Sequence, residues 1–345
     1  NFQVSMVPSL RRLLRCVQPR HIKHNYVCKR YQHLVNLAPP SSTPHISSLG
    51  DKLEQFAAIL SQAKRPLIVS GAGISTESGI PDYRSPSRIN KYSPIKYQEF
   101  IKSVYHRRRY WARSTLGYET QMKVAKPNES HHIITKWKMN EPDGNQMKLV
   151  TQNVDSLHLK SSFPYFDMLE IHGALRDVSC LSCNAQLSRD DFQSLLKENN
   201  PEFFDKNTTN NNEKKLFELR PDGDIALNDN EYDYNSFIIP KCKYCKESDS
   251  IRPNVVFFGE NLEKSTADTS ISWSKKADAI IVCGSTLQTQ SSHRLLRHAR
   301  EQNESIPIVI INIGETRADN ICNVKIEHYV SDVLKHVDNL LSGEK

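Results

Sequence analysis

Short apolar runs that alternate with helical patterns are the feature that most constrains the fold of this chain. Residues 67–69, 148–151, 168–171, 255–258, 279–283 and 308–313 are such runs, and they predict buried strands. Helical spacing marks Leu53–Leu60, which should end before Pro66, and also Glu263–Lys276 and Ser291–Gln302. Strands that alternate with helices favour an α/β fold, in which helices cover both faces of a mostly parallel sheet.

The pattern changes between His172 and Val255. This stretch holds paired cysteines, an Asn-rich run at Asn207–Asn212 and an acidic, glycine-poor region around Asp222–Asp233. We interpret it as a smaller module inserted into the α/β fold, with a mobile loop.

Charge is distributed unevenly along the chain. The net charge is +7, but residues 1–50 hold seven Arg and Lys and no Asp or Glu, which leaves the remainder electrically balanced. The folded part therefore offers no basic face large enough to favour a nucleic-acid partner. The longest apolar run, Ile306–Ile313, is far shorter than the roughly 18 residues that a membrane span requires, so no membrane partner is expected.

The basic N-terminal stretch has its own pattern. Leu10, Leu13 and Leu14 lie beside arginines and can form a small amphipathic helix. This is typical of a mitochondrial transit peptide, and the alternative is a disordered basic tail. A Pro- and Ser-rich linker, Leu37–Ser48, follows.

A glycine turn, Gly71–Gly79 (GAGISTESG), follows the first predicted strand. Small residues let the backbone approach a pyrophosphate closely, and free N–H groups at a helix start favour its negative charge. Thr76 occupies the position where the ordinary dehydrogenase fingerprint has its third glycine. Taken alone, the turn indicates a nucleotide site but leaves a purely structural turn open.

The residues after the turn make the signal specific. Ile80–Arg84 reads IPDYR, and the run Gly71–Arg84 resembles the NAD-binding signature of the sirtuin family. The resemblance implies that NAD is a co-substrate, with phosphate near the turn and nicotinamide near Ile80 and Asp82. The NAD-binding residues it implies in this run are Gly71, Ala72, Gly73, Ser75, Ile80, Pro81, Asp82, Tyr83 and Arg84.

Two further motifs stand at the ends of the next predicted strands, Thr151–His158 (TQNVDSLH) and Glu170–Gly173 (EIHG). In an open α/β sheet the carboxyl ends of the strands face the ligand crevice. Asn153 and Asp155 also suit helix capping, and a lone strand-end histidine is more often structural. Both motifs resemble sirtuin motifs, which implies that His172 and Asn153 are catalytic. The NAD-binding residues implied here are Gln152, Asn153, Val154 and Asp155.

The resemblance also implies a defined reaction. The acyl oxygen of a modified lysine attacks the ribose carbon that bears nicotinamide, and nicotinamide leaves. His172 then acts as a general base toward a ribose hydroxyl, which commits the acyl group to ADP-ribose. The expected function is NAD-dependent deacylation of protein lysines, of the deacetylase or lipoamidase type.

Four of the eight cysteines form two C-x-x-C pairs, Cys180 with Cys183 and Cys242 with Cys245. Thiolates at this spacing bind zinc tetrahedrally. The 58 residues between the pairs exceed the usual 15 to 20 or so. The extra closure entropy, on the order of 1 kcal/mol, is small beside the roughly 10–16 kcal/mol of structural zinc binding.

Two other readings of the cysteines are weaker. A reducing mitochondrial matrix disfavours disulfides, and a redox centre needs only one C-x-x-C. We expect one structural zinc ion, because four sulfur ligands leave no open position for catalysis.

Further matches follow the later strands. The resemblance implies additional NAD contacts at Gly284, Ser285, Thr286, Asn312, Ile313, Gly314 and Val330. Asn254–Glu260 resembles the family segment that pairs with an extended substrate peptide, and its alternative is a plain core strand.

The resemblance spans residues 51–330 and predicts the domain organisation. We expect a transit peptide and linker over 1–50 and a catalytic domain over 51–345. Within it, a Rossmann-like NAD-binding part would cover 51–172 and 251–345, and a zinc module with an insertion would cover 173–250. Pro221–Asp224 and Asn312–Arg317 resemble the class II branch that contains mitochondrial sirtuin four. The mitochondrial matrix and acyl-lysine proteins are the location and partners this implies.

Two other functions remain open from the sequence. Protein mono-ADP-ribosyl transfer would use the same ribose carbon with a different acceptor. An NAD-sensing regulatory partner with weak catalysis would keep the binding motifs without turnover.

Overall fold

The computed structural model describes residues 44–83, 94–208, 218–227 and 232–343. The predicted transit peptide and most of its linker lie outside these residues, and their assignment stays a prediction. The described chain begins its regular structure with η3 (Ile46–Leu49) and α1 (Gly50–Gln62), close to the predicted start near Asp51.

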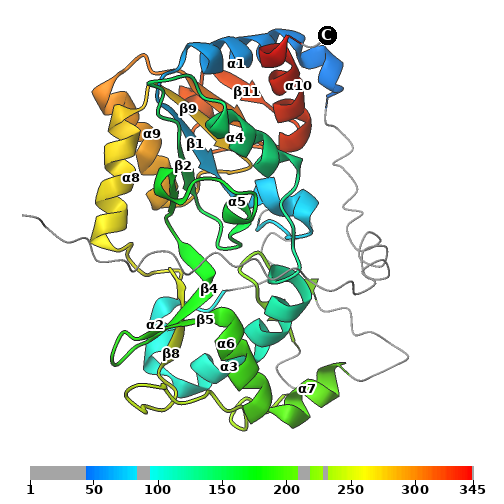
Figure 1. Cartoon of the computed structure of the whole chain (residues 1–345), viewed down its shortest axis with the longest axis vertical. Helices are drawn as coiled ribbons and strands as arrows, with labels where there is room; N and C mark the ends of the chain where they lie inside the picture. The colour runs from blue at the N-terminus through cyan, green and yellow to red at the C-terminus, as the bar shows by residue number, and fades with distance from the viewer. Residues whose placement is uncertain (1–43, 84–93, 209–217, 228–231, 344–345) are drawn as a thin grey trace, which may run out of the picture. The chain divides into compact units, whose positions relative to one another are not determined.

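A six-stranded parallel sheet organises the larger part of the fold (Figure 1). Its strands follow the spatial order β11-β10-β9-β1-β2-β3. They are β1 (Pro66–Ser70), β2 (Lys148–Thr151), β3 (Met168–Glu170), β9 (Ala279–Cys283), β10 (Ile308–Ile311) and β11 (Val324–Ile326). The chain thus runs outward from β1 to β3 and then returns to the other side of β1, which is the doubly wound, Rossmann-like order. The predicted α/β fold is confirmed, although β11 was not predicted.

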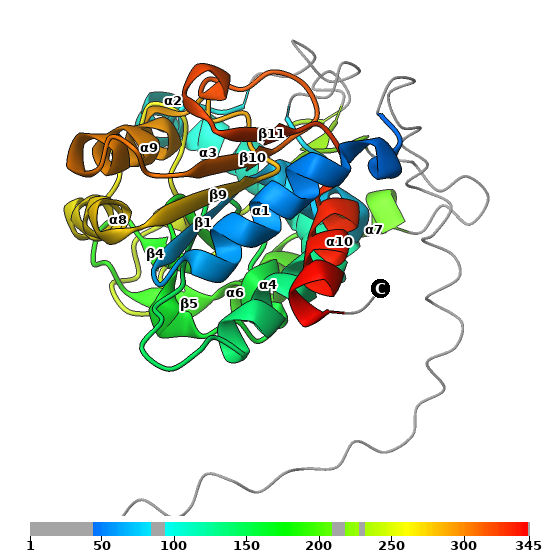
Figure 2. The ribbon, with the colours of Figure 1, turned by 90° about the horizontal axis from the view of Figure 1, so that it is seen from above.

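Helices cover both faces of this sheet (Figure 2). One face packs against α1, α4 (Glu129–Met139) and α10 (Val330–Ser342), and the other against α8 (Lys264–Lys276) and α9 (Gln290–Gln302). The predicted helices at 263–276 and 291–302 are therefore confirmed to within one residue. Because side chains alternate along a strand, each strand supplies both cores.

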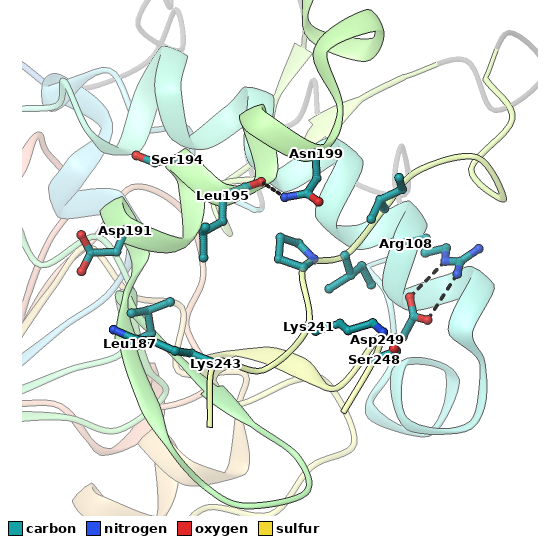
Figure 3. Close-up of a pocket in the computed structure, with 13 residues that line it drawn as sticks. Arg108, Leu187, Asp191, Ser194, Leu195, Asn199, Lys241, Lys243, Ser248 and Asp249 are labelled. Atoms are coloured by element: carbon teal, nitrogen blue, oxygen red, sulfur yellow. Dashed lines mark hydrogen bonds and ion pairs between the residues drawn. The ribbon is translucent and has the colours of Figure 1, made fainter. Parts of the chain in front are cut away.

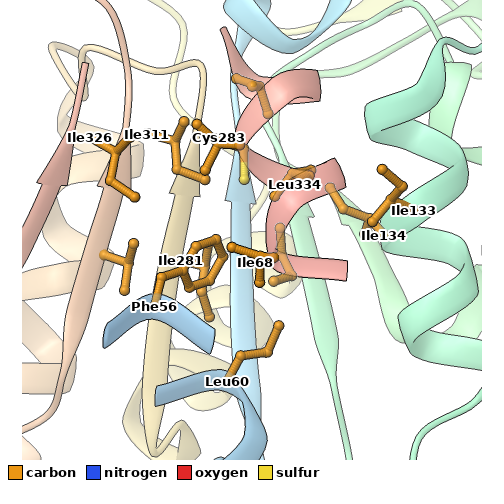
Figure 4. Close-up of a cluster of buried hydrophobic side chains, with 14 of the residues drawn as sticks. Phe56, Leu60, Ile68, Ile133, Ile134, Ile281, Cys283, Ile311, Ile326 and Leu334 are labelled. Atoms are coloured by element: carbon orange, nitrogen blue, oxygen red, sulfur yellow. The ribbon is translucent and has the colours of Figure 1, made fainter. Parts of the chain in front are cut away.

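The alternation is visible in β1 and β9. Ile68 and Ile281 lie in the core with Phe56 of α1 and Leu334 of α10 (Figure 4). Leu67 and Ile280, their neighbours in sequence, lie in the opposite core with Leu295 and Leu296 of α9. Burial of each such side chain stabilises the fold by about 1.5–3 kcal/mol. This two-sided packing holds the strand ends in a fixed register.

The smaller part of the fold is built around a three-stranded antiparallel sheet in the order β5-β4-β8. Its elements are β4 (Gly173–Cys180), β5 (Gln186–Ser188), α6 (Arg189–Asn199), α7 (Pro201–Thr208), β6 (Glu218–Leu219), β7 (Ile225–Ala226) and β8 (Ile251–Val255). Its core also includes Phe100 and Trp111, which belong to α2 (Tyr97–Lys102) and α3 (Val104–Gly117). Two distant stretches of the chain therefore build this part together.

The prediction of a strand over 255–258 was wrong in both place and partner. Strand β8 ends at Val255 and pairs antiparallel with β4, in the smaller sheet. Beyond it, Phe257 is buried and stacks on Phe100 with ring centroids 4.7 Å apart. The apolar run thus reflects aromatic packing after the strand instead of a strand in the parallel sheet.

A single glycine lets the chain pass from the large sheet to the small one. Gly173 has a φ of +75°, and a Cβ built there would lie 2.0 Å from the carbonyl oxygen of Asn254. Only glycine fits both conditions. The preceding residue, His172, is therefore held at the junction of the two sheets.

Shorter elements complete the described chain, and they are η4 (Ala72–Ser78), η5 (Tyr118–Met122), α5 (Leu157–Lys160), η6 (Tyr165–Asp167) and η7 (Asp319–Ile321). In the portion of the chain that the structure describes, no helix combines the length and apolarity that a membrane crossing requires.

Candidate active site and zinc centre

The glycine turn lies at the point where the strand order reverses, between β1 and β9. Ligands of doubly wound sheets bind at this switch point, beyond the carboxyl ends of the strands. Gly71 donates its N–H to the carbonyl of Cys283 at 3.0 Å, and Gly73 donates to the carbonyl of Gly284 at 2.9 Å. A Cβ on Gly73 would lie 2.8 Å from the Cα of Gly284. The glycines are thus needed for strand-end packing as well as for an open backbone.

The turn continues as the seven-residue 3-10 helix η4 and ends at Gly79, whose φ is +85°. Beyond it, Ile80 and Pro81 are buried, and Asp82 is half-buried. Tyr83 is exposed and meets Phe258 edge to face, with ring centroids 6.3 Å apart. Arg84 lies outside the described residues.

Asn153 and Asp155 converge on the glycine turn from the loop after β2. The Asn153 amide donates to the carbonyl of Gly71 and to Oγ of Ser75, both at 3.1 Å. Ser75 in turn donates to the carboxylate of Asp155 at 2.7 Å. Asp155 also accepts the N–H of Leu157, the first residue of α5, at 2.9 Å, although the N-cap position of that helix is Ser156. Burial raises the pKa of Asp155, against these hydrogen bonds that favour the carboxylate.

His172 lies at the carboxyl end of β3 with both ring nitrogens engaged. Its Nδ1 lies 3.0 Å from the carbonyl of Gln152. Because a carbonyl can only accept, this contact places the proton on Nδ1 and leaves Nε2 as a hydrogen-bond acceptor. Burial lowers the pKa of His172 below its ordinary value, partly offset by the Gln152 carbonyl. The ring is thus a neutral base near pH 7.

Ser291 was not singled out from the sequence, yet it contacts the base atom of His172. Its Oγ lies 2.9 Å from Nε2 and has a second acceptor, Oγ1 of Thr289, at 3.2 Å. Thr289 lies 3.4 Å from the side-chain oxygen of Gln152, which closes a ring of polar contacts around the imidazole. The start of α9 carried no sequence signal beyond a plain Ser/Thr-rich N-terminus.

The other predicted NAD residues lie at neighbouring strand ends. The Gln152 amide donates to Oγ of Ser285 at 2.8 Å, which links β2 to the loop after β9. Val154 accepts an N–H bond from Leu175, and Thr286 accepts one from Arg317. After β10, Asn312 donates to the carbonyls of Ile313 and Gly314. Val330 begins α10 and is buried.

A buried ionic network lies where the insertion meets α3. Arg113 contacts Asp224 at 2.9 Å and donates from Nε to the carbonyl of Ile225 at 2.8 Å. Arg220 contacts the same carboxylate at 3.2 Å. Burial is the main cause that raises the pKa of Asp224 to about 6, although both arginines oppose it. Close backbone packing accompanies the network, since a Cβ on Gly117 would lie 2.2 Å from the carbonyl of Gly223.

The four predicted cysteines gather at the end of the smaller part, with all four sulfurs within 4.8 Å of one another. Cys180 and Cys245, and Cys183 and Cys242, each lie 3.6 Å apart through Sγ. Tetrahedral zinc with Zn–S bonds of about 2.3 Å requires sulfurs about 3.8 Å apart, so the cluster fits zinc.

The two C-x-x-C turns have the same backbone form. The residue after each pair donates its N–H back to the first cysteine, Asn184 to Cys180 at 2.9 Å and Lys246 to Cys242 at 3.0 Å. Both Asn184 and Lys246 have left-handed backbones, with φ of 57° and 63°. Each turn therefore aims its two thiols at the same point.

Two concave regions lie away from the glycine turn. A groove of about 900 Å³ lies on the zinc module between α6 and residues 238–243 (Figure 3). A smaller, more polar cavity of about 320 Å³ borders the junction of the sheets, with Glu170, Gly173 and Asn254 in its wall.

Comparison with known proteins agrees with this arrangement. The model of the Sir2 family matches residues 71–291. The chain is 39% identical over 279 residues to "NAD-dependent protein deacylase SIR4" of Batrachochytrium dendrobatidis, covering 79% of this chain and 88% of that one. It is 35% identical over 309 residues to "NAD-dependent protein lipoamidase sirtuin-4, mitochondrial" of Homo sapiens, covering 88% of this chain and 90% of that one.

A solved structure gives the same fold. The structure titled "Structural Basis for the Mechanism and Regulation of Sir2 Enzymes" superimposes with a TM-score of 0.61 at 26% identity, covering 86% of this chain and 99% of that one. The fold and the site thus define a doubly wound nucleotide-binding domain that carries a four-cysteine zinc module. The chain belongs to the Sir2 family, the sirtuins.

Proposed function

We propose that this chain is an NAD-dependent protein-lysine deacylase that releases nicotinamide and O-acyl-ADP-ribose. The observation that carries the proposal is the neutral His172, whose Nδ1 is fixed by the Gln152 carbonyl. Gln152 in turn donates its backbone N–H to Ser70, the residue before the glycine turn. Family membership and relatives named as NAD-dependent deacylases support it.

The residues at the switch point are suited to hold NAD. The backbone of Gly71–Gly73 borders Gly284 and Ser285 and would bind the phosphates, and Asn312 would lie on the adenosine side. Asn153 and Asp155, joined through Ser75, would hold the nicotinamide half. When bound, NAD supplies a sugar carbon from which nicotinamide can leave.

His172 is assigned the proton transfer. Its Nε2 takes the proton of a ribose hydroxyl while Nδ1 keeps its own proton on the Gln152 carbonyl. Asn153 is assigned a contact near the reacting ribose, because its amide nitrogen already lies beside Gly71 and Ser75. General-base help of this kind contributes about 10²- to 10⁴-fold to the rate.

The substrate is proposed to bind beyond β8. Phe258 is exposed, and its carbonyl accepts the N–H of Tyr97, which fixes the backbone of the segment. An extended acyl-lysine peptide would pair with this segment through its main chain, which is compatible with many protein sequences. The relatives named lipoamidases make lipoyl-lysine the acyl group to test beside acetyl-lysine.

A mitochondrial location is proposed on two grounds, the acid-free basic N-terminal stretch and the relatives named as mitochondrial. Imaging the full chain fused at its C-terminus to a fluorescent protein tests this. Diffuse fluorescence outside mitochondria would contradict it.

One assay separates the proposed activity from its alternatives. Purified protein, NAD and a panel of acetyl-, acyl- and lipoyl-lysine peptides are incubated, and the products are identified by mass spectrometry. Deacylation yields nicotinamide, the peptide with its lysine unmodified, and O-acyl-ADP-ribose in equal amounts. ADP-ribosylated protein without peptide deacylation would support the transferase instead, and NAD binding without nicotinamide would support a sensor.

The matched variant is His172→Ala. It should bind NAD with a nearly unchanged Kd, because the ring contacts protein groups rather than the glycine turn. Its deacylation rate should fall by at least about 10²-fold. A variant that turns over peptide at the wild-type rate would remove His172 from the mechanism.

A further inference from the structure

The groove on the zinc module has an apolar lining that is open to solvent. Leu187 of β5 and Leu195 of α6 form one side and are half-buried (Figure 3). Ile238 also lines the groove and is 51% exposed. The groove volume of about 900 Å³ lies within the range of ligand sites. These aliphatic side chains gather in a concavity and are not scattered singly over the surface.

The wall that carries Ile238 is held in place by two buried or half-buried side chains. The Asn200 amide accepts the N–H of Ile238 at 2.7 Å and donates to its carbonyl at 2.9 Å, as a paired strand would. Arg108 donates to the carbonyl of Asn235 at 2.7 Å. With its backbone so fixed, Ile238 remains exposed at the groove instead of folding into the core, so an occupant meets a preformed surface.

The charges at the groove favour an acidic occupant. Lys241 and Lys243 are exposed on its rim, and neither has an acidic partner among the described residues. Of the two acids in the lining, Asp249 is neutralised by Arg108, whose Nε and Nη2 lie 3.0 and 3.2 Å from its carboxylate. Asp191 is the remaining one, at the start of α6. Among the side chains that line the groove, the unpaired charge is therefore two positive against one negative.

From these observations we propose that the groove docks a short acidic segment of a partner protein. One aliphatic side chain of that segment packs against Leu195 and Ile238, and its flanking carboxylates contact Lys241 and Lys243. The groove shares no lining residue with the glycine turn or with His172. Docking there is a function separate from deacylation, and it places the zinc module in partner recognition.

A peptide selection tests the proposal. The probe is a bead library of octapeptides that contain no lysine, so that the deacylase site selects none of them, with a central leucine and neighbours drawn from Asp, Arg, Ser and Ala. The wild-type protein is expected to select peptides with Asp on both sides of the leucine. The best peptide, labelled with fluorescein, then gives a Kd by fluorescence anisotropy.

Three variants make the result specific. Ile238→Ser should weaken the selected peptide at least tenfold. Lys241→Glu with Lys243→Glu should change the preference from Asp to Arg. Lys275→Glu with Lys276→Glu carries the same charge change on exposed residues at the end of α8 and should leave binding unchanged. Zinc content and deacylase rate, measured on each variant, confirm that the fold is intact.

Each other outcome overturns the proposal. These outcomes are no selection by the wild-type protein, equal binding by Ile238→Ser, or an Asp preference that survives the charge reversal. Failure of an unlabelled copy of the peptide to compete would show that the protein binds the fluorescein label and not the peptide.

Discussion

The Nε2 atom of His172 and the Oγ atom of Ser291 lie 2.9 Å apart. A serine at the start of α9 therefore hydrogen-bonds the nitrogen that is proposed to act as the catalytic base. The Ser291 hydroxyl also lies 3.2 Å from Oγ1 of Thr289. A ribose hydroxyl that approaches Nε2 can displace Ser291 without leaving a buried hydroxyl unpaired, because the second acceptor is in place. Ser291 thus contacts the base atom of the imidazole only until a ribose hydroxyl takes its place.

Ser291→Ala should change kcat by less than about 3-fold, because a ribose hydroxyl has replaced the Ser291 hydrogen bond at Nε2 before the proton moves. The Kd for NAD should stay unchanged, because Ser291 contacts His172 and Thr289 rather than the glycine turn. Ser291→Thr keeps the hydroxyl and should retain most of the rate. Ser292→Ala is the control, because its Oγ bonds Thr289 and not His172. A kcat lowered tenfold or more by Ser291→Ala would show that Ser291 keeps its contact with His172 during the reaction.

The pH dependence of kcat/KM, which reports the free protein, should reflect the lowered pKa of His172. Burial disfavours the charged ring, so the neutral base predominates at pH 7 and is lost as the pH falls through a value below the ordinary 6.5. We expect kcat/KM to reach half its maximum at a pH below 6.5. A half-maximum above 6.5, measured with NAD and peptide well below saturation, would show that another group controls the rate.

Gly284→Ala should destabilise the chain strongly. Gly284 has a φ of +62°, and a Cβ there would lie 2.4 Å from the backbone nitrogen of Ile74. The matched control is Gly144→Ala, because Gly144 has a φ of +84° and no atom within 4 Å of an added Cβ. Its free energy of unfolding should fall by only about 1 kcal/mol, through backbone strain alone. Urea unfolding without NAD compares them. A similar fall in the free energy of unfolding for both variants would mean that the loops after β1 and β9 are not closely packed at Gly284.

Asp224→Asn should lower the free energy of unfolding by about 3–5 kcal/mol, because it leaves Arg113 as an uncompensated buried charge. The control, Glu129→Gln, breaks an ion pair with Lys335 whose side chains are 52% and 57% exposed, and it should cost at most about 1 kcal/mol. Chemical denaturation measures both. A small effect of Asp224→Asn would show that the insertion is not anchored on α3 by this pair.

Purified protein should hold one zinc ion per chain, as measured by elemental analysis. Cys245→Ser removes one of four sulfurs and should release the metal and unfold the zinc module, whereas Cys322→Ser lies outside the cluster and should keep it. A chelator that strips zinc should lower the melting temperature of the wild type. Full stability of the metal-free protein would show that the four cysteines are not a structural metal site.

The sequence predicted best where local chemistry alone decides the structure. Ala279–Cys283 forms a strand because its residues are apolar on both faces, and the two C-x-x-C turns bring their thiols together. Strand β4 escaped prediction because Gly173–Cys180 mixes charged and apolar residues and is stabilised by its partners β5 and β8. The contact of Ser291 with His172 joins residues that are 119 positions apart, and no local pattern marks it.

A crystal structure with NAD and an acyl-lysine peptide tests the central claim most directly, through the distance from His172 Nε2 to the nearest ribose hydroxyl of NAD. We expect that hydroxyl within hydrogen-bond reach of Nε2, where Ser291 Oγ now lies, and the phosphates beside Gly71–Gly73. An NAD molecule bound away from the glycine turn, or a ribose far from His172, would contradict the account.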